Sequence, residues 1–335
     1  MKTFKTFAGI DISKLTLDVS IVHLCDAATV LHFKTANNVK SITQLLTGLS
    51  SQGICMKDTL FTCENTGIYT IPFITAMSMN ELNYWVVPAI EIKRSQGLYR
   101  GKNDKADSKI IALYGLTHQH RYTPCLLAEK QIQQLKLLFT EREKILKAIA
   151  LFERTQENEM YLCKEVFAVV KKLNRQQLNH LNKALMQIDK QMMEIIKQHQ
   201  LLNTQYELLT SIPGIGKQTA LYLIITTRSF KTFKTWRQMA CYAGVAPFEY
   251  SSGTSIKGRT KVNHIADKKM KSMLQMCVLS AVKYDAEIKR YYQKKKAEGK
   301  HTMLIMNNIR CKLLARAFAV INRGTPFVEL KKFAA

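Results

Sequence analysis

The sequence predicts an α/β domain followed by long helices and a compact, mainly helical domain. Short alternating apolar segments fill residues 6–22, 59–64 and 83–88. The middle third carries apolar residues at helical spacing with almost no Gly or Pro, and Gly- and Pro-marked turns return from residue 208. Strands followed by alternating helix and strand are typical of a layered α/β fold. We therefore expect three regions, at 1–125, 126–210 and 211–335.

The first region begins with two predicted strands joined by a tight turn at Ser13–Lys14. Alternation in the second strand puts its apolar residues on one face and Asp18 on the polar face, where we expect solvent to surround it. The strand at 59–64 leads through the turn "NTG" into an apolar helix over roughly 68–79. A further strand at 83–88 precedes a basic connection and a helix that opens at Asp104.

The middle region has the spacing of a coiled coil. Apolar residues recur at intervals of three and four at Leu178, Leu181, Leu185, Ile188, Met192 and Ile195. An earlier run from Leu135 to Phe152 keeps the same rhythm with one polar interruption, at Arg142. We expect two helices that fold back as an antiparallel hairpin or pair between protomers, and so form a long helical spacer with a role in oligomerisation. Two ordinary core helices are less favoured, because almost no Gly or Pro interrupts the region.

Basic residues are concentrated in the last region. The chain carries 50 Lys and Arg against 25 Asp and Glu, a formal net charge of +25. Residues 211–335 alone hold 24 basic and 6 acidic side chains. Such a surface favours a polyanionic partner, and nucleic acid is favoured over an acidic membrane because the basic residues alternate with turn motifs.

Cysteine usage and hydropathy exclude other classes of protein. The eight cysteines contain no C-x-x-C pair, which argues against a zinc site and a disulfide framework. No segment resembles a signal peptide or a membrane span, so we expect a soluble, cytoplasmic protein without membrane association.

Acidic residues at the ends of predicted elements indicate a metal site. In "RGKNDKADSKIIALYG", Asp104 and Asp107 share one face of a helix, where Asn103 as N-cap and a favourable helix dipole would also explain them. Asp11 ends the first strand and Glu64 ends "TLFTCE". These four carboxylates can converge on one edge of a sheet, where they would repel strongly unless Mg²⁺ lay between them.

Five motifs in register resemble one family. "GIDISKLTLDV", "CENTGIY" and "KNDKADSKIIA" resemble the acidic blocks of the DEDD transposases of insertion sequences, a family that includes Piv-like DNA invertases. "SIPGIGKQTA" and "YAGVAPFEYSSGTSIKG" resemble the C-terminal transposase domain. The resemblance implies a RuvC-like first domain with an RNase H fold, and Mg²⁺ held by Asp11, Glu64, Asp104 and Asp107. Asn103 stands where the family usually has Thr, and Ser108 where it usually has Ala.

The segment "EYSSGTSIKGRTK" offers Ser251, Ser252 and Ser255 beside Gly253. From the residues alone, a Ser/Gly turn that binds phosphate is favoured, because no neighbouring base activates a serine. The resemblance instead implies that Ser252 is the nucleophile and that DNA is cut through a phosphoserine intermediate. Candidates for stabilising phosphate charge follow the turn at Lys257, Arg259 and Lys261.

"SIPGIGKQTA" has the pattern of a helix-hairpin-helix turn, in which Pro213 and Gly214 shape the turn. Gly216 and Lys217 would meet a DNA phosphate at the next helix's N-terminus, although a plain interhelical turn has the same pattern. Further basic contacts are expected at Lys102 and Lys105.

The resemblance implies donor and target DNA, guidance by a bridge RNA, a dimer or tetramer, and a bacterial, nucleoid-associated protein. A site-specific invertase with the same chemistry is one alternative. A metal-dependent, RuvC-like nuclease that cuts branched DNA by hydrolysis is another, and a DNA-packing protein without chemistry is a third.

Overall fold

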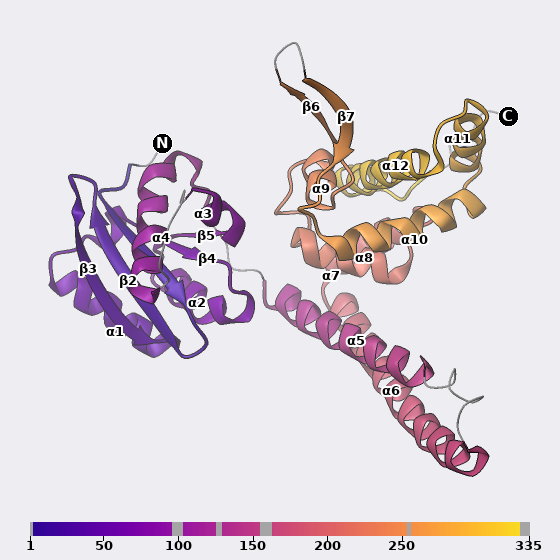
Figure 1. Ribbon diagram of the computed structural model, residues 1–335, viewed down its shortest axis with the longest axis horizontal. Coiled ribbons are helices and arrows are strands. Elements are labelled where there is room, and N and C mark those ends of the chain that lie inside the picture. Colours follow the sequence, from indigo (N-terminus) through magenta and orange to yellow (C-terminus); the bar gives the residue numbers. More distant parts are fainter. Residues whose placement is uncertain (1–2, 96–102, 125–128, 155–162, 253–255, 329–335) are drawn as a thin grey trace. The chain divides into compact units, whose positions relative to one another are not determined.

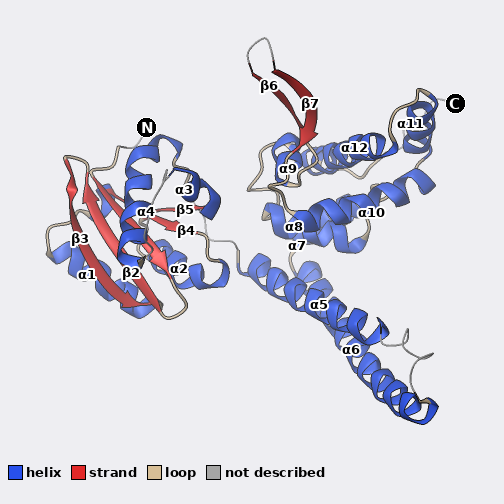
Figure 2. Ribbon diagram, viewed as in Figure 1, coloured by secondary structure: helices blue, strands red, loops and turns tan. Residues whose placement is uncertain are grey.

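The computed structural model describes residues 3–95, 103–124, 129–154, 163–252 and 256–328 (Figures 1 and 2). The chain forms two compact units, Met1–Leu127 and Ala128–Ala335, and each is considered by itself. The first is a mixed α/β layer and the second is mainly helical, which confirms the predicted α/β plus α class. The division of the helical part into a spacer and a C-terminal domain remains a prediction.

The first unit is built on a five-stranded sheet with the order β3-β2-β1-β4-β5. Strands β1, β2 and β3 are antiparallel neighbours, whereas β4 runs parallel to β1, and β5 runs parallel to β4. The strands are β1 (Thr6–Ile12), β2 (Thr16–His23), β3 (Asp26–Ala36), β4 (Thr59–Glu64) and β5 (Asn83–Val87). Strand β3 was not predicted from the sequence.

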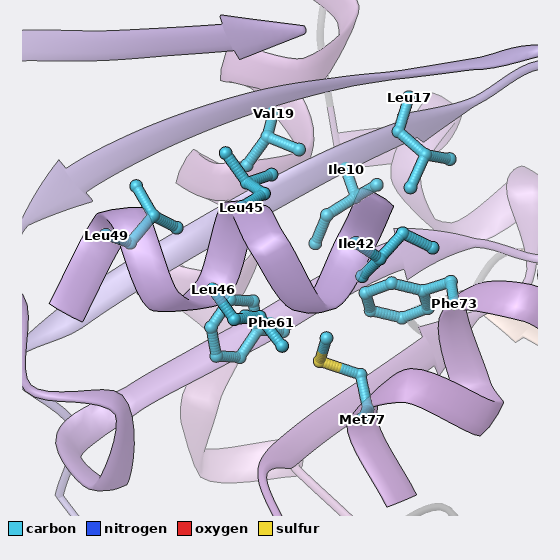
Figure 3. Close-up of a pocket in the computed structure, with 10 residues that line it drawn as sticks. All are labelled: Ile10, Leu17, Val19, Ile42, Leu45, Leu46, Leu49, Phe61, Phe73 and Met77. Atoms are coloured by element: carbon cyan, nitrogen blue, oxygen red, sulfur yellow. The ribbon is translucent and has the colours of Figure 1, made fainter. Parts of the chain in front are cut away.

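Helices cover both faces of this sheet. One face packs on α1 (Val39–Ser51) and α2 (Ile71–Met79), and Figure 3 shows their apolar side chains meeting those of the sheet, such as Ile10 and Phe61. The other face packs on α3 (Ala89–Ser95) and α4 (Asp104–His118). Short 3₁₀ turns lie at Met56–Asp58, Gly67–Thr70 and Gln119–Arg121.

Helix α4 lies directly against the backbone of the sheet. A Cβ atom on Gly9 of β1 would stand 2.1 Å from the Ala112 nitrogen and 2.2 Å from the Ser108 carbonyl oxygen, so only glycine permits this approach. The buried hydroxyls of Ser20 on β2 and Ser108 lie 2.7 Å apart and form a hydrogen bond. Together these contacts set the depth at which α4 sits on β1 and β2.

The second unit gathers eight helices and one hairpin in the residues described. Helices α5 (Lys130–Arg154) and α6 (Lys164–Gln198) run side by side in opposite directions (Figure 1). The other helices are α7 (Gln200–Thr210), α8 (Lys217–Thr227), α9 (Trp236–Tyr242), α10 (Lys268–Tyr284), α11 (Ala286–Ala297) and α12 (Thr302–Arg323). Strands β6 (Pro247–Ser252) and β7 (Ile256–Val262) form an antiparallel hairpin that stands away from the helices (Figure 2).

The start of α5 belongs to the core of this unit. Its Ile132, Leu135 and Phe139 are buried with residues of α6 and α8, and the Phe139 ring stacks on Tyr222 at 5.0 Å between centroids. Farther along, the Arg142 guanidinium donates to Asp189 of α6 at 2.8 Å. Thus Arg142, the polar interruption in the apolar run, forms an ion pair between α5 and α6.

Within the described residues, the helices include none with the length and apolar character needed to cross a bilayer.

Candidate functional site

The sheet brings two of the four predicted acids to one edge. Strands β1 and β4 are parallel, with Ile10 paired to Cys63, so Asp11 and Glu64 follow at the same ends of adjacent strands. The Ile10 side chain faces α1 and α2. Successive side chains of a strand point to opposite faces of the sheet, so Asp11 lies on the face that α4 covers. Asp104 and Asp107 occupy the first turn of α4, whose packing on Gly9 holds that turn over the same edge.

The four carboxylates influence one another electrostatically. Asp11 is half-buried, and its pKa is raised to about 6, first by burial and then by the negative charges of Asp107, Asp104 and Glu64. Asp18 adds a smaller contribution of the same sign. A carboxyl group that resists ionisation among its neighbours marks a place where a cation would be strongly favoured.

These residues suit a hard divalent cation in chemistry, though not yet in geometry. Carboxylate oxygens are the ligands that Mg²⁺ takes, and a bound cation would relieve the repulsion that raises the pKa of Asp11. Across the described part of the chain, no three His, Cys, Asp or Glu side chains converge closely enough to hold an ion as they stand. The side chains would therefore need to turn toward a shared ion.

Asp18 is not solvent-exposed, contrary to the sequence-based expectation. It pairs directly with Asp11 across β1 and β2, and only 5% of its surface is accessible. Its carboxylate contacts His32 Nε2 at 3.1 Å and Lys34 Nζ at 3.3 Å, both from β3. The alternation pattern correctly put Asp18 on the polar face, but β3, which supplies both partners, was not predicted.

The first turn of α4 is capped as its sequence suggests. Asn103 accepts a hydrogen bond from the Lys105 backbone N–H at 2.9 Å, so the Asn at this position preserves the N-cap. Ser108 replaces the usual Ala at no cost in unpaired polar groups, because its hydroxyl meets Ser20 and also donates to the Lys105 carbonyl at 3.0 Å. Lys105 is exposed beside the acids, and Lys102 lies outside the described residues.

The predicted nucleophile lies in the β6–β7 hairpin. Ser252 is the last residue of β6 and is paired through its backbone with Ile256, and residues 253–255 are not described. The side chains of Ser252, Lys257 and Arg259 are also outside the description, so their roles remain predictions. Lys261 is exposed on β7, opposite Phe248.

Both ends of this hairpin are anchored to helices. Before β6, the Val245 carbonyl accepts from Asn307 Nδ2 of α12 at 2.7 Å. After β7, the Asp267 N–H donates to the Tyr242 carbonyl at 2.9 Å, and the Tyr222 hydroxyl donates to Asp267 Oδ2 at 2.8 Å. Sequence reasoning missed these anchors because they join residues 25 to 62 positions apart.

The proposed helix-hairpin-helix turn connects α7 to α8. Gly214 has a φ of +98°, and a Cβ there would lie 2.7 Å from Ala281 Cβ on α10, so this glycine is required by packing. Gly216 caps α8 with a φ of −84° and has open space where its Cβ would be. Pro213 is partly exposed, whereas Gly216 and Lys217 are exposed, which leaves the start of α8 accessible to a phosphate.

The four acids belong to the first unit and Ser252 to the second. Their meeting in one reaction centre therefore remains a prediction.

Two family models match the chain. A transposase model of the DEDD type, associated with IS110, matches residues 8–157, which include the four acids. A model of the transposase IS116/IS110/IS902 family matches residues 206–293, which include the glycine turn and the β6–β7 hairpin.

Three curated proteins are similar over different lengths. Two are pilin gene-inverting proteins, from Moraxella lacunata (27% identical over 330 residues) and Moraxella bovis (28% over 331). Each alignment covers 96% of this chain and 98% of the relative. An uncharacterized 43.6 kDa protein of insertion element IS110 from Streptomyces coelicolor is 33% identical over 118 residues, which are 35% of this chain and 29% of that protein.

Proposed function

Because this chain belongs to the DEDD-type insertion-sequence transposase family and is a DNA-recombining enzyme, we propose that it cuts and rejoins DNA through a phosphoserine at Ser252. Asp11, Glu64, Asp104 and Asp107 would hold Mg²⁺ in an RNase H-like first domain. The five-stranded mixed sheet, with acids at the ends of its central parallel strands, supports that assignment.

Each step of the proposed reaction breaks one phosphate ester bond and forms another. The Ser252 oxygen attacks phosphorus, a serine–phosphate bond forms, and the bond to one DNA oxygen breaks. The serine proton is lost and the leaving DNA oxygen gains one. The free hydroxyl of an exchanged strand then attacks the phosphoserine and releases the serine. No nucleotide cofactor is needed, because each broken ester is replaced by another.

The chain's own residues have separate tasks in this scheme. Bound Mg²⁺ would polarise the scissile phosphate and stabilise its developing charge. The anchors at Val245 and Asp267 hold both ends of the hairpin that carries the serine. Lys257, Arg259 and Lys261 would surround the phosphate charge, and Gly216 with Lys217 would fix the DNA backbone without reading its sequence.

Partners and assembly are proposed from the family resemblance and from charge. The 24 basic side chains of residues 211–335 would allow the chain to bind DNA and RNA together. A bridge RNA would select the donor and target sites. A dimer or tetramer would use the α5–α6 pair, in keeping with its coiled-coil spacing. Full-length similarity to the two pilin gene-inverting proteins keeps inversion of a DNA segment as the second candidate outcome of the same chemistry.

One observation carries the proposal most directly. Burial and then the charges of Asp107, Asp104 and Glu64 raise the pKa of Asp11, although the four acids come from three places in the sequence. A structural explanation of each acid alone, such as helix capping, would not bring Glu64 and the α4 acids to the end of β1.

The test is to trap the covalent intermediate. We would incubate the full chain with Mg²⁺ and a suicide DNA substrate that loses its leaving strand, and detect a protein–DNA adduct by denaturing electrophoresis. Ser252→Ala should abolish the adduct and strand cleavage, whereas Ser251→Ala, the neighbouring control, should retain both. Asp11→Ala should abolish cleavage. Cleavage that persists in Ser252→Ala would support a hydrolytic nuclease instead, and unchanged activity in Asp11→Ala would contradict the metal site.

A second measurement addresses guidance. RNA that co-purifies with the full chain should be enriched in one transcript encoded beside the gene. Recovery of only bulk cellular RNA would contradict guidance and leave the phosphoserine chemistry untouched.

A further inference from the structure

Asp18 is a buried acid beside the proposed metal site that the mechanism above does not use. It lies opposite Asp11 on β1, and its own neighbour on β3 is Lys34. Asp11, Asp18 and Lys34 therefore form one row across the neighbouring strands β1, β2 and β3. Neighbouring strands are about 4.8 Å apart, so the Lys34 Cα lies roughly 10 Å from that of Asp11.

A buried negative charge at Asp18 is unfavourable beside the other acids unless polar partners stabilise it. Its side chain is 8% exposed, and its charge helps to raise the pKa of Asp11. A buried carboxylate is costly without partners, and here the partners are His32 Nε2 at 3.1 Å and Lys34 Nζ at 3.3 Å. An apolar residue would fill the position without opposing the ionisation of Asp11.

Lys34 is held in an unusual way for a surface lysine. Its side chain is 54% exposed, yet its ammonium group is fixed to a carboxylate that solvent hardly reaches. A fully exposed pair would be weak and mobile. This pair instead keeps a positive charge on the side of the sheet where Asp11 lies, one strand beyond Asp18.

We propose that Asp18 positions Lys34 to bind a DNA backbone phosphate next to the one that reacts at Asp11. A strand whose scissile phosphate lies at the four acids must pass along one side of them, and Lys34 marks that side as the β3 edge. The ammonium can contact Asp18 and a phosphate oxygen together because it has three donors. The inference rests on the proposed function, which puts the reacting phosphate at Asp11.

The main rival explanation is that Lys34 only protects an edge strand. Strand β3 is at the edge of the sheet, and lysines on edge strands commonly prevent pairing with other chains. The two explanations differ in what the loss of each charge does to DNA binding.

The experiment measures the affinity of the full chain for a labelled DNA duplex over a series of salt concentrations, with Ca²⁺ replacing Mg²⁺ so that the strands stay intact. The variants are Lys34→Gln, Asp18→Asn and the double variant. Lys40→Gln is the matched control, because Lys40 is an exposed lysine on α1, which covers the opposite face of the sheet.

Loss of one phosphate contact should reduce the slope of log affinity against log salt by about 1 in Lys34→Gln. At about 0.1 M salt, this corresponds to roughly eightfold weaker binding, since each contact contributes a slope of about 0.9. Lys40→Gln should resemble the unmodified chain. Asp18→Asn should also weaken binding, and the double variant should match Lys34→Gln, because Asp18 acts through Lys34.

Two results would overturn the proposal. One is a slope for Lys34→Gln equal to that for Lys40→Gln. The other is tighter binding by Asp18→Asn, which is what the removal of a negative charge near DNA produces when that charge holds nothing in place. If Asp18→Asn does not fold, the two lysine variants decide the matter alone. Failure here leaves the Ser252 and Asp11 tests unaffected, because binding is measured without cleavage.

Discussion

Gly9→Ala should separate helix α4 from the sheet and so disrupt the proposed metal site without touching any of its acids. The added Cβ would lie 2.1 Å from the Ala112 nitrogen, whereas ordinary contact begins at 3.4 Å, so the helix must retreat by at least about 1.3 Å. That movement stretches the 2.7 Å hydrogen bond between Ser20 and Ser108 beyond its useful range. It also carries Asp104 and Asp107 away from Asp11.

We expect this variant to lose about 2–5 kcal/mol of stability in the first unit. Overpacking costs about 1–3 kcal/mol, and leaving buried hydroxyls unpaired costs about 1–2 kcal/mol. Displacement of catalytic groups by about 1 Å lowers rates by roughly 100-fold, so strand cleavage should fall at least that far. Gly48→Ala is the control, because Gly48 is exposed on α1 with open space around it and should gain about 0.5–1 kcal/mol.

The assay is urea denaturation of the full chain, monitored by tryptophan fluorescence. The chain has two tryptophans, and in a Trp236→Phe background only Trp85 reports. Trp85 is buried and packs on Tyr114 of α4 at 5.5 Å between ring centroids, so its emission follows the sheet–helix contact. An unchanged midpoint together with normal cleavage in Gly9→Ala would refute the reasoning about α4.

Three further outcomes follow from the structure. Because the folded-state pKa of Asp11 is raised from 3.8 to about 6, the metal-free protein loses stability as pH rises from about 4 through 6, so Asp11→Asn should be more stable at pH 8. The full shift corresponds to about 3 kcal/mol, and solvent screening of the half-buried carboxyl reduces the expected gain to about 1–2 kcal/mol. Urea denaturation in EDTA would show that gain shrinking toward pH 4, and an equal gain at both pH values would contradict it. Gly214→Ala should lower the melting temperature, because its Cβ would clash with α10. Gly216→Ala should have a normal melting temperature, because the space around Gly216 is open. Weaker binding of duplex DNA by Gly216→Ala would indicate that the start of α8 contacts a phosphate. Asn307→Ala should slow strand transfer without weakening DNA binding, because it removes the 2.7 Å hydrogen bond that anchors the Val245 carbonyl and leaves it the longer contact from Cys311 Sγ, at 3.4 Å. Equal losses in both would indicate general unfolding.

The spacing of apolar residues and the cap residues predicted those strands and helices whose bounds depend on local sequence. The strand ending at Glu64 has the predicted bounds, 59–64, and the predicted strand at 83–88 is β5, one residue shorter. The helix opening at Asp104 begins at that residue, because Asn103 provides a clear N-cap. The expected apolar helix over 68–79 is divided into a 3₁₀ turn and α2.

Features that depend on distant contacts could not be predicted in this way. The burial of Asp18 depends on partners supplied by β3, a strand with no clean alternation of its own. The sequence predicts a Ser/Gly turn in a mainly helical region, whereas Pro247–Ser252 and Ile256–Val262 pair as the β6–β7 hairpin. Its Gly, Ser and Lys residues have weak strand propensity, so its strand pairing could not be predicted from local pattern.

The serine pair beneath α4 has a consequence for exchanging parts between homologous recombinases. A helix taken from a relative with alanine in place of Ser108 would remove the 2.7 Å partner of the buried Ser20 hydroxyl and leave it the Lys105 carbonyl, 3.5 Å away. The two positions should therefore be transplanted together, and a chimaera that changes one without its mate should express as a weakened protein even when every acid is intact.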